Sequence, residues 1–184
     1  MKVTAGLYKT RKITTISSKK LRPTSSKIRE AIFNILINRY DWNSWAHKAH
    51  LLDAFAGVGT ISIEAFSRNL KEATLIEKNN KIFSELKKNL SKNIPKNRVT
   101  FYRKNFFDID LKRNCYNIVY LDPPYLSDFV NVSIKKILSE KALKKDGIII
   151  SETIKSYKFN HELNEFINFS RTYGKSSITF FKFV

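Results

Sequence analysis

The tetrapeptide Asp122-Pro123-Pro124-Tyr125 is the sequence feature with the clearest chemical meaning. It follows an apolar run at 117–121 that is typical of a buried strand. Two successive prolines remove two amide donors and fix the backbone angle, so this strand end offers mainly acceptors. The Asp122 carboxylate and the Pro123 carbonyl can accept hydrogen bonds from a planar NH₂ group, while the Tyr125 ring can stack on a flat base. The motif predicts a site for an exocyclic amine on a planar heterocycle, and a purely structural Pro-Pro turn is the alternative.

A second candidate site lies upstream, in the segment LLDAFAGVGT at 51–60. Asp53 ends an apolar run, and Gly57 and Gly59 follow in a tight turn before an apolar helix. Glycine lets the backbone approach a ligand closely, and the N-terminus of the following helix presents free amides. In open α/β sheets, ligands bind at the carboxyl ends of strands, which is where this loop falls. A G-x-G pattern without a third glycine is common, and an ordinary turn is the alternative.

Two further polar residues close neighbouring strands. Glu77 ends ATLIE, 24 residues after Asp53, where a carboxylate is placed to accept hydrogen bonds from both hydroxyls of a ribose. Asn105 follows VTFYRK, with Phe106 directly after it, so that an amide and a ring can reach an adenine edge and face. A strand-end glutamate can also be solvated or pair with Lys78. The combination with the glycine loop favours the ligand site.

Repeated strand–helix units must position these residues. Short apolar runs that suit strands alternate with segments that suit helices, which predicts a mostly parallel sheet covered on both faces. The expected strands are 50–55, 73–77, 98–102, 117–121 and 147–151, and the expected helices are 60–69, 79–93 and 127–143. The aromatic and β-branched tail predicts a closing antiparallel hairpin at 166–173 and 176–183, joined through Gly174.

The N-terminal region differs from the rest of the chain. Residues 1–29 hold nine Lys and Arg and no Asp or Glu. KVTAGLY and RKITTI have the alternating, β-branched character of a small β-hairpin, and 21–40 have the apolar spacing of a helix, with N-cap hydroxyls at 24–26. We therefore expect a basic hairpin-and-helix appendage at 1–48 and a single compact domain at 49–184.

The composition restricts the function further. Lys and Arg (34) outnumber Asp and Glu (16), and the formal net charge of +18 argues for a polyanionic partner, although a Lys-, Asn- and Ile-rich composition also follows from an AT-rich genome. Apolar residues at 42% predict a folded core in this 184-residue chain. No apolar run approaches the roughly 18 residues that span a bilayer, so we expect a cytoplasmic protein without membrane association. One Cys and three His offer no metal-ligand spacing, so we expect no metal ion.

These motifs, in this order, resemble those of class I S-adenosylmethionine-dependent methyltransferases that act on amino groups. The shared elements are the D-x-F-x-G-x-G loop, the acidic end of the second strand and the D-P-P-Y motif. LRPTSSKIREAIFNIL, LLDAFAGVGTISIEAFSRN and VYLDPPY are similar to the RsmD family of 16S rRNA guanine-N(2) methyltransferases. The similarity covers nearly the whole chain. It implies a Rossmann-like α/β fold whose mostly parallel seven-stranded sheet has an antiparallel last strand, preceded by an N-terminal β-hairpin and helix.

The resemblance also implies a role for each matching residue. Residues at the ends of the first three strands are expected to bind S-adenosyl-L-methionine: Asp53, Phe55, Gly57, Gly59, Glu77, Lys78, Asn105 and Phe106. The guanine-holding, catalytic set is Asp122, Pro123, Pro124 and Tyr125. Basic residues of the appendage are expected to contact rRNA phosphates: Lys9, Arg11, Lys12, Arg22 and Arg29. Many class I enzymes have Asp where this chain has Asn105, although an amide can still address the adenine amino group.

The expected activity is methyl transfer to the N(2) amino group of a guanine in 16S rRNA, with free rRNA or the 30S subunit as partner of a monomeric chain. Adenine-N(6) nucleic-acid methyltransferases use the same DPPY edge, but they usually carry a target-recognition domain for which 184 residues leave little room. Protein-glutamine methyltransferases generally show Asn-Pro-Pro-Tyr, against which Asp122 argues. A non-catalytic rRNA-binding or assembly module is the alternative from a different class.

Overall fold

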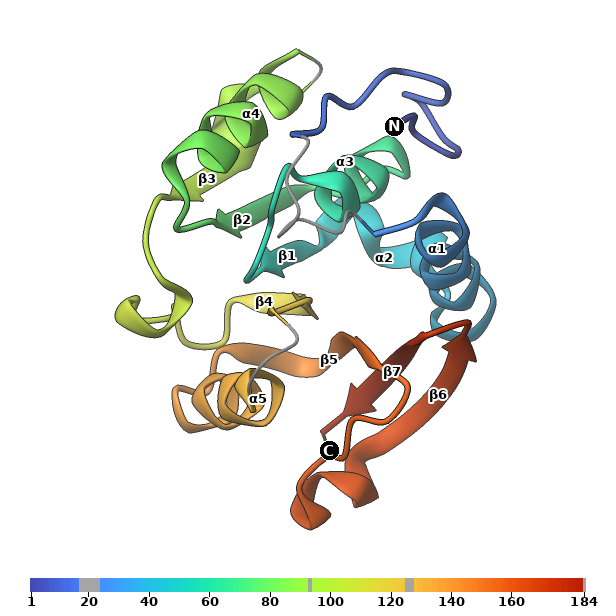
Figure 1. Ribbon diagram of the computed structural model, residues 1–184, viewed down its shortest axis with the longest axis vertical. Coiled ribbons are helices and arrows are strands. Elements are labelled where there is room, and N and C mark those ends of the chain that lie inside the picture. The colour runs from blue at the N-terminus through green and yellow to red at the C-terminus, as the bar shows by residue number, and fades with distance from the viewer. Residues whose placement is uncertain (17–23, 93, 125–127, 184) are drawn as a thin grey trace. The chain divides into compact units, whose positions relative to one another are not determined.

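The computed structural model describes residues 1–16, 24–92, 94–124 and 128–183. These residues form two compact units, Met1–Phe106 and Phe107–Val184 (Figure 1). The expected boundary between residues 48 and 49 does not coincide with the division of the structure. The N-terminal segment belongs to the same unit as the first three strands, because its apolar side chains, such as Val3 and Ile13, are buried.

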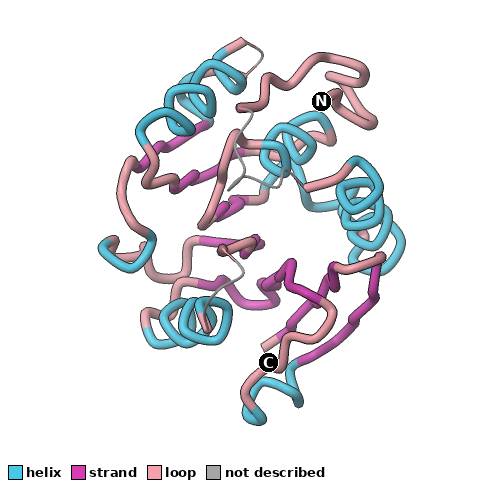
Figure 2. Tube along the Cα trace, viewed as in Figure 1, coloured by secondary structure: helices cyan, strands magenta, loops and turns pink. Residues whose placement is uncertain are grey.

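The first unit contains three parallel strands in the order β3-β2-β1. They are β1 (His50–Asp53), β2 (Glu72–Ile76) and β3 (Val99–Tyr102). Parallel neighbours need a long crossover, and helices α3 (Thr60–Ser67) and α4 (Asn80–Ser91) supply it (Figure 2). The register pairs Leu52 with Thr74, and Leu75 with Phe101. The three strands therefore end together, and the loops that follow them emerge at one edge of this sheet.

Two helices precede β1 in the same unit. Ser25 accepts a hydrogen bond from the Ile28 amide at 3.2 Å and caps α1 (Ser26–Tyr40), as the hydroxyls before this helix predict. Helix α2 (Trp42–Trp45) follows, and the fully buried Trp42 donates its indole N–H to the Arg68 carbonyl at 2.8 Å. The expected N-terminal β-hairpin is shorter than predicted. Among residues 1–16, its strands pair only through an isolated antiparallel bridge between Lys2 and Lys12.

The second unit contains four strands in the order β4-β5-β7-β6. They are β4 (Tyr116–Leu121), β5 (Leu143–Ile154), β6 (Ile167–Tyr173) and β7 (Ser176–Lys182), with helix α5 (Phe129–Ser139) between β4 and β5. Strands β4 and β5 are parallel, whereas β7 is antiparallel to both of its neighbours. Gly174 turns the β6–β7 hairpin with a φ of 62°. The seven strands confirm the predicted α/β class, with mainly parallel pairing and an antiparallel last strand.

Strand β5 differs most from its expected bounds, since it extends to Ile154 and not to residue 151, and the helix expected at 127–143 ends at Ser139. Strand β5 begins at Leu143 and not at residue 147, because Leu143 pairs with Tyr116 across a register shift in β4. The polar sequence Lys144-Lys145-Asp146 hides this extension from a hydrophobicity pattern. Short 3₁₀ helices complete the fold: η1 (Ala46–Lys48), η2 (Lys96–Arg98), η3 (Phe106–Asp108) and η4 (His161–Phe166).

Candidate active site

The glycine loop joins β1 to α3 and requires glycine for two separate reasons. Gly57 and Gly59 have φ values of 54° and 86°, in the left-handed region that side chains disfavour. A Cβ on Gly59 would also lie only 2.6 Å from a methyl of Leu90 and 2.7 Å from one of Leu86, both on α4. The Ala56 amide donates to the Ile76 carbonyl at 2.9 Å and ties the loop to the end of β2. The loop is thus held close to both α4 and β2.

Asp53 lies at the end of β1 and is 1% exposed. Its carboxylate accepts a hydrogen bond from the Ser62 hydroxyl of α3 at 2.7 Å. Burial raises the pKa of Asp53 from its ordinary value of 3.8 to about 7; the Ser62 hydrogen bond opposes this rise and the nearby Glu77 carboxylate adds to it. A buried carboxylate that titrates near neutrality is well suited to receive a positively charged ligand group.

Glu77 is held by two backbone amides. Its Oε2 accepts from the Gly57 amide at 3.2 Å, and its Oε1 accepts from the Asn79 amide at 2.7 Å. Burial raises the pKa of Glu77, and the hydrogen bonds from the Asn79 and Gly57 amides work against this rise. Each carboxylate oxygen has a second acceptor position. Both carboxylate oxygens can therefore accept a hydrogen bond from a ligand, as a pair of vicinal hydroxyls would offer.

Aromatic side chains border the same strand ends. The Phe106 side chain is buried after β3, and its ring centroid lies 5.5 Å from that of Phe55 in the glycine loop. Asn105 is half-buried beside Phe106, and Lys78 is exposed next to Glu77. All the residues expected to bind the cofactor thus lie in the first unit, in the loops that follow β1, β2 and β3.

Asp122, Pro123 and Pro124 follow β4 in the second unit, as the sequence predicts. Asp122 is half-buried, Pro123 is buried and Pro124 is exposed. Neither proline has an amide N–H, so the strand ends on carbonyl and carboxylate acceptors. Tyr125 lies outside the described residues.

Asn89 on α4 is a site-supporting residue that the sequence reasoning missed. Its amide is 3% exposed and donates to the Val58 carbonyl of the glycine loop at 3.0 Å. The same amide group donates to the Thr14 carbonyl at 2.9 Å and accepts from the Thr14 amide at 3.0 Å. One buried side chain therefore fixes the N-terminal segment and the glycine loop to α4. The signal in the sequence is an Asn between Leu86 and Leu90 on the apolar face of that helix.

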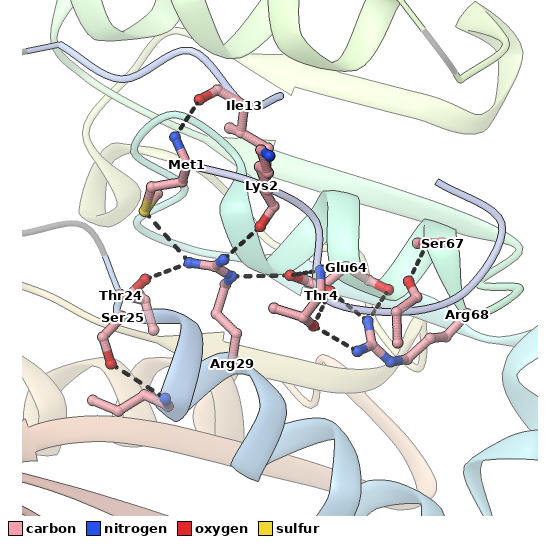
Figure 3. Close-up of polar contacts among 12 residues, drawn as sticks. Met1, Lys2, Thr4, Ile13, Thr24, Ser25, Arg29, Glu64, Ser67 and Arg68 are labelled. Atoms are coloured by element: carbon pink, nitrogen blue, oxygen red, sulfur yellow. Dashed lines mark hydrogen bonds and ion pairs between the residues drawn. The ribbon is translucent and has the colours of Figure 1, made fainter. Parts of the chain in front are cut away.

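The prediction that Arg29 contacts RNA phosphates is wrong. Its side chain is fully buried, and its Nε pairs with Glu64 Oε1 at 3.0 Å (Figure 3). The other guanidinium nitrogens donate to the carbonyls of Thr24, at 2.7 Å, and Lys2, at 2.8 Å. A guanidinium with these partners and no exposed surface cannot reach a polyanion. Its role is to join α1 and the N-terminal segment to α3.

Glu64 completes this buried cluster. Its Oε2 accepts from the Thr4 hydroxyl at 2.8 Å and pairs with Arg68 at 2.5 Å (Figure 3). Nearby, the Leu7 amide donates to the Ser67 carbonyl at 2.7 Å, and a Cβ on Gly6 would meet that carbonyl oxygen at 1.9 Å. These contacts hold the N-terminal turn against the end of α3.

The other predicted RNA-binding residues have different surroundings. Lys9, Arg11 and Lys12 are exposed on the N-terminal turn, where the Arg11 guanidinium lies 4.9 Å from the centre of the Tyr8 ring. Arg22 lies outside the described residues. Among the described residues, no group of three or more His, Cys, Asp and Glu side chains is placed to hold a metal ion. In the same part of the chain, no helix combines the length and the apolar character needed to cross a membrane.

The fold is that of class I methyltransferases. A solved structure of a Haemophilus influenzae protein matches with a TM-score of 0.80 at 24% identity, covering 98% of this chain and 97% of that chain. The structure of an RNA methyltransferase from Salinibacter ruber matches with a TM-score of 0.63 at 19% identity, covering 88% of this chain and 93% of that chain. At these identities the likeness establishes the fold.

Sequence comparison establishes the family. The chain belongs to the family described as conserved hypothetical protein 95, the RsmD family of methyltransferases, whose model matches residues 1–182. A relative from Buchnera aphidicola subsp. Acyrthosiphon pisum, named ribosomal RNA small subunit methyltransferase D, is 37% identical over 152 residues, which is 82% of this chain and 76% of that protein. The resemblance seen in the sequence motifs is thereby confirmed.

Proposed function

We propose that this protein transfers a methyl group from S-adenosyl-L-methionine to the exocyclic N(2) amino group of a guanine in 16S rRNA. The observation that carries the proposal is the acceptor-only end of β4, where the half-buried Asp122 is followed by two prolines, in a chain whose relative is named for methylation of small-subunit rRNA. Such an edge suits an NH₂ group on a flat base. The proposal includes a monomeric enzyme that acts in the cytoplasm without a metal ion.

The residues of the first unit fit this cofactor. Asp53 offers a buried carboxylate with a pKa near neutrality, which the ammonium or sulfonium charge of the cofactor would complement. Glu77 offers two carboxylate oxygens, already oriented by the Gly57 and Asn79 amides, to the two ribose hydroxyls. Phe106 and Asn105 would border the adenine. The Salinibacter ruber RNA methyltransferase, which shares the fold, was solved in complex with S-adenosyl-L-homocysteine.

The chemistry asks this chain mainly for alignment. Bound S-adenosyl-L-methionine supplies a methyl group already activated by its sulfonium charge. The amino nitrogen of guanine is a weak nucleophile because its lone pair is delocalised into the ring. Hydrogen bonds from the NH₂ group to the Asp122 carboxylate and the Pro123 carbonyl would orient that lone pair, and Asp122 would stabilise the positive charge that develops on nitrogen. The proton then leaves to solvent.

Exposed cations on the N-terminal turn would hold the RNA. We assign Lys9, Arg11 and Lys12 to rRNA phosphates, together with Arg22. The turn is fixed to α3 by Ser67 and through Glu64, so its charges are presented from a firm support. Binding through phosphates predicts an affinity for rRNA that falls steeply as the salt concentration rises.

A methyl-transfer assay separates this proposal from its rivals. Purified protein is incubated with tritiated S-adenosyl-L-methionine in three parallel reactions, which contain 30S particles, free 16S rRNA or double-stranded DNA. We expect label in 16S rRNA, recovered after nuclease digestion as N(2)-methylguanosine. Label in adenine would favour the adenine-N(6) enzyme, and rRNA binding without transfer would favour the non-catalytic assembly module.

A further inference from the structure

The segment that follows β5 contains two exposed lysines and no acidic residue. Residues 155–160 read Lys-Ser-Tyr-Lys-Phe-Asn, and no acidic residue lies between Glu152 and Glu162. The segment is orange in Figure 1, between β5 and β6. Lys155 and Lys158 are exposed, and neither forms an ion pair within the described part of the chain. Cations interleaved with aromatic rings are typical of surfaces that bind nucleic acid.

Hydrogen bonds fasten this segment to the start of α5. The Tyr157 hydroxyl donates to Asp128 Oδ1 at 3.0 Å and accepts from the Asn131 amide at 3.3 Å. The Asn131 side chain donates to Asp128 Oδ1 at 2.5 Å and to Asn160 Oδ1 at 3.1 Å. Its own oxygen accepts from the Asn160 amide at 3.2 Å. Asn131 is 4% exposed, so these bonds form around a buried amide.

Aromatic packing holds the segment from the other side. The Tyr157 ring lies 5.1 Å from that of Phe159, edge to face, and Phe159 lies 5.0 Å from Phe181 of β7 in the same arrangement. The Lys155 amide also donates to the Lys175 carbonyl at 2.9 Å. The two lysines therefore project from a backbone that is anchored to α5 and to the β6–β7 hairpin, so they are presented at fixed positions.

The anchor point is close in the chain to the proposed substrate residues. Asp128 is six residues after Asp122, and six residues span at most about 20 Å when fully extended. The anchored segment and the acceptor edge of β4 both follow the carboxyl ends of the adjacent parallel strands β5 and β4. A phosphate bound by Lys155 or Lys158 would thus lie within a few nucleotides of a base held at Asp122.

We propose that residues 155–160 form a second RNA-contact site, in which Lys155 and Lys158 bind backbone phosphates flanking the target base. The Asp128–Asn131–Tyr157–Asn160 cluster acts as a positioning device that keeps these lysines at fixed positions relative to the start of α5, six residues after Asp122 in the chain. This inference rests on the proposed function, since it takes rRNA as the substrate. It adds a contact in the second unit to those proposed for the N-terminal turn.

Charge reversal tests the phosphate contacts. Lys155→Glu/Lys158→Glu is compared with Lys112→Glu/Lys145→Glu, which makes the same change in charge at exposed positions before β4 and at the beginning of β5. We expect the first pair to raise the KM for 16S rRNA at least tenfold. We also expect it to reduce the slope of log affinity against log salt by about 1.5, the value for two lost phosphate contacts to a single strand. The Kd for S-adenosyl-L-methionine should stay within twofold of wild type.

Tyr157→Phe tests the positioning device. Phenylalanine keeps the ring against Phe159 but removes the hydroxyl that joins Asp128 to Asn131. We expect kcat on rRNA to fall three- to tenfold with little change in cofactor affinity, whereas a purely structural hydroxyl would change only the melting temperature. A kcat equal to wild type would overturn the positioning role.

Separate measurements of rRNA binding and methyl transfer distinguish a failure of the second RNA-contact site from a failure of the proposed function. Filter binding of 16S rRNA is measured beside methyl transfer for every variant. If wild type binds rRNA but transfers no methyl group, the proposed function fails, and the salt slopes still decide the role of Lys155 and Lys158. If the two charge-reversed pairs give the same slope and the same affinity, the second RNA-contact site does not exist.

Discussion

The two units hold their proposed binding residues in different ways. In the first unit, Asp53 is buried and accepts a hydrogen bond from a hydroxyl, and Glu77 is half-buried and accepts hydrogen bonds from two backbone amides. In the second unit, Asp122 is half-buried and is followed directly by two prolines, and a hydrogen-bonded cluster lies at Asp128, six residues further along the chain. A small cofactor calls for a preformed, desolvated site. A base that must be splayed out of folded RNA calls for an accessible edge, with contacts that hold the strand nearby.

Asp122→Ala tests the role of the second unit in holding the substrate. We expect Asp122→Ala to lower kcat on rRNA by about 100- to 1,000-fold, because it removes the charged acceptor that faces the developing positive charge. The Kd for S-adenosyl-L-methionine, measured by calorimetry, should remain within about twofold of wild type if the two roles are separate. A loss of cofactor affinity as large as the loss of turnover would contradict the division of roles.

Removing Arg29 tests whether buried charges support the first unit. Arg29→Met leaves the Glu64 carboxylate in the interior with Arg68 as its remaining cationic partner. We expect the free energy of unfolding, measured with urea, to fall by about 3 kcal/mol. Lys27→Met on the same helix is the control, because Lys27 is exposed, and it should change stability by less than about 0.5 kcal/mol. Equal effects of the two substitutions would mean that the buried cluster is not a fixed support.

Glu77→Gln is expected to weaken cofactor binding, whereas Asp122→Ala is expected to leave it unchanged. Glu77→Gln keeps the shape of the side chain but removes its charge. The hydrogen bonds that the ribose hydroxyls would donate to this side chain are weaker when the acceptor is neutral. We expect the Kd for S-adenosyl-L-methionine to rise about 10- to 100-fold, which corresponds to about 1.5–3 kcal/mol for hydrogen bonds to a charged group. Filter binding of 16S rRNA should be unchanged. A variant that lost rRNA affinity without losing cofactor affinity would reverse the assignment of the two sites.

The pH dependence of stability tests whether the pKa of Asp53 is raised by burial. Its pKa is about 7 in the folded protein and near 3.8 when solvated, so the folded state holds the proton more tightly. The contribution of Asp53 to stability is therefore greatest below pH 3.8 and declines as the pH rises from there through 7. The expected decline from pH 5 to pH 7 is on the order of 2 kcal/mol. Asp53→Asn keeps an acceptor for Ser62 but cannot ionise, so unfolding curves of this variant should lack that part of the decline. Parallel curves for the two proteins would mean that Asp53 is solvated.

The sequence predicted those parts of the fold and site that depend on local patterns. Short apolar runs located β1 to β4 within one or two residues, because β1, β2 and β4 are largely buried and β3 is partly buried, and buried strands are mainly apolar. The residues at the strand ends were found because glycine, proline and acidic residues interrupt those runs. The start of β5 was missed because Leu143 is paired by tertiary context across a polar stretch.

Charged and amide groups that act inside the protein were not predictable in this way. Arg29 has the type of a surface residue, and only its four-way contact with Glu64, Thr24, Lys2 and Met1 shows that it is internal. Asn89 likewise owes its role to Thr14 and Val58, which are far away in the chain. A local pattern contains no information about such partners, which the fold alone brings together.

The central claim is that this protein methylates one guanine of 16S rRNA at N(2). Its most direct test is mass spectrometry of nuclease fragments of 16S rRNA from cells with and without the gene, and from cells that carry the Asp122→Ala variant. We expect that one N(2)-methylguanosine is lost in the deletion strain, stays absent with Asp122→Ala and returns with the wild-type protein. A guanine methylation map that is identical in all of these cells would contradict it.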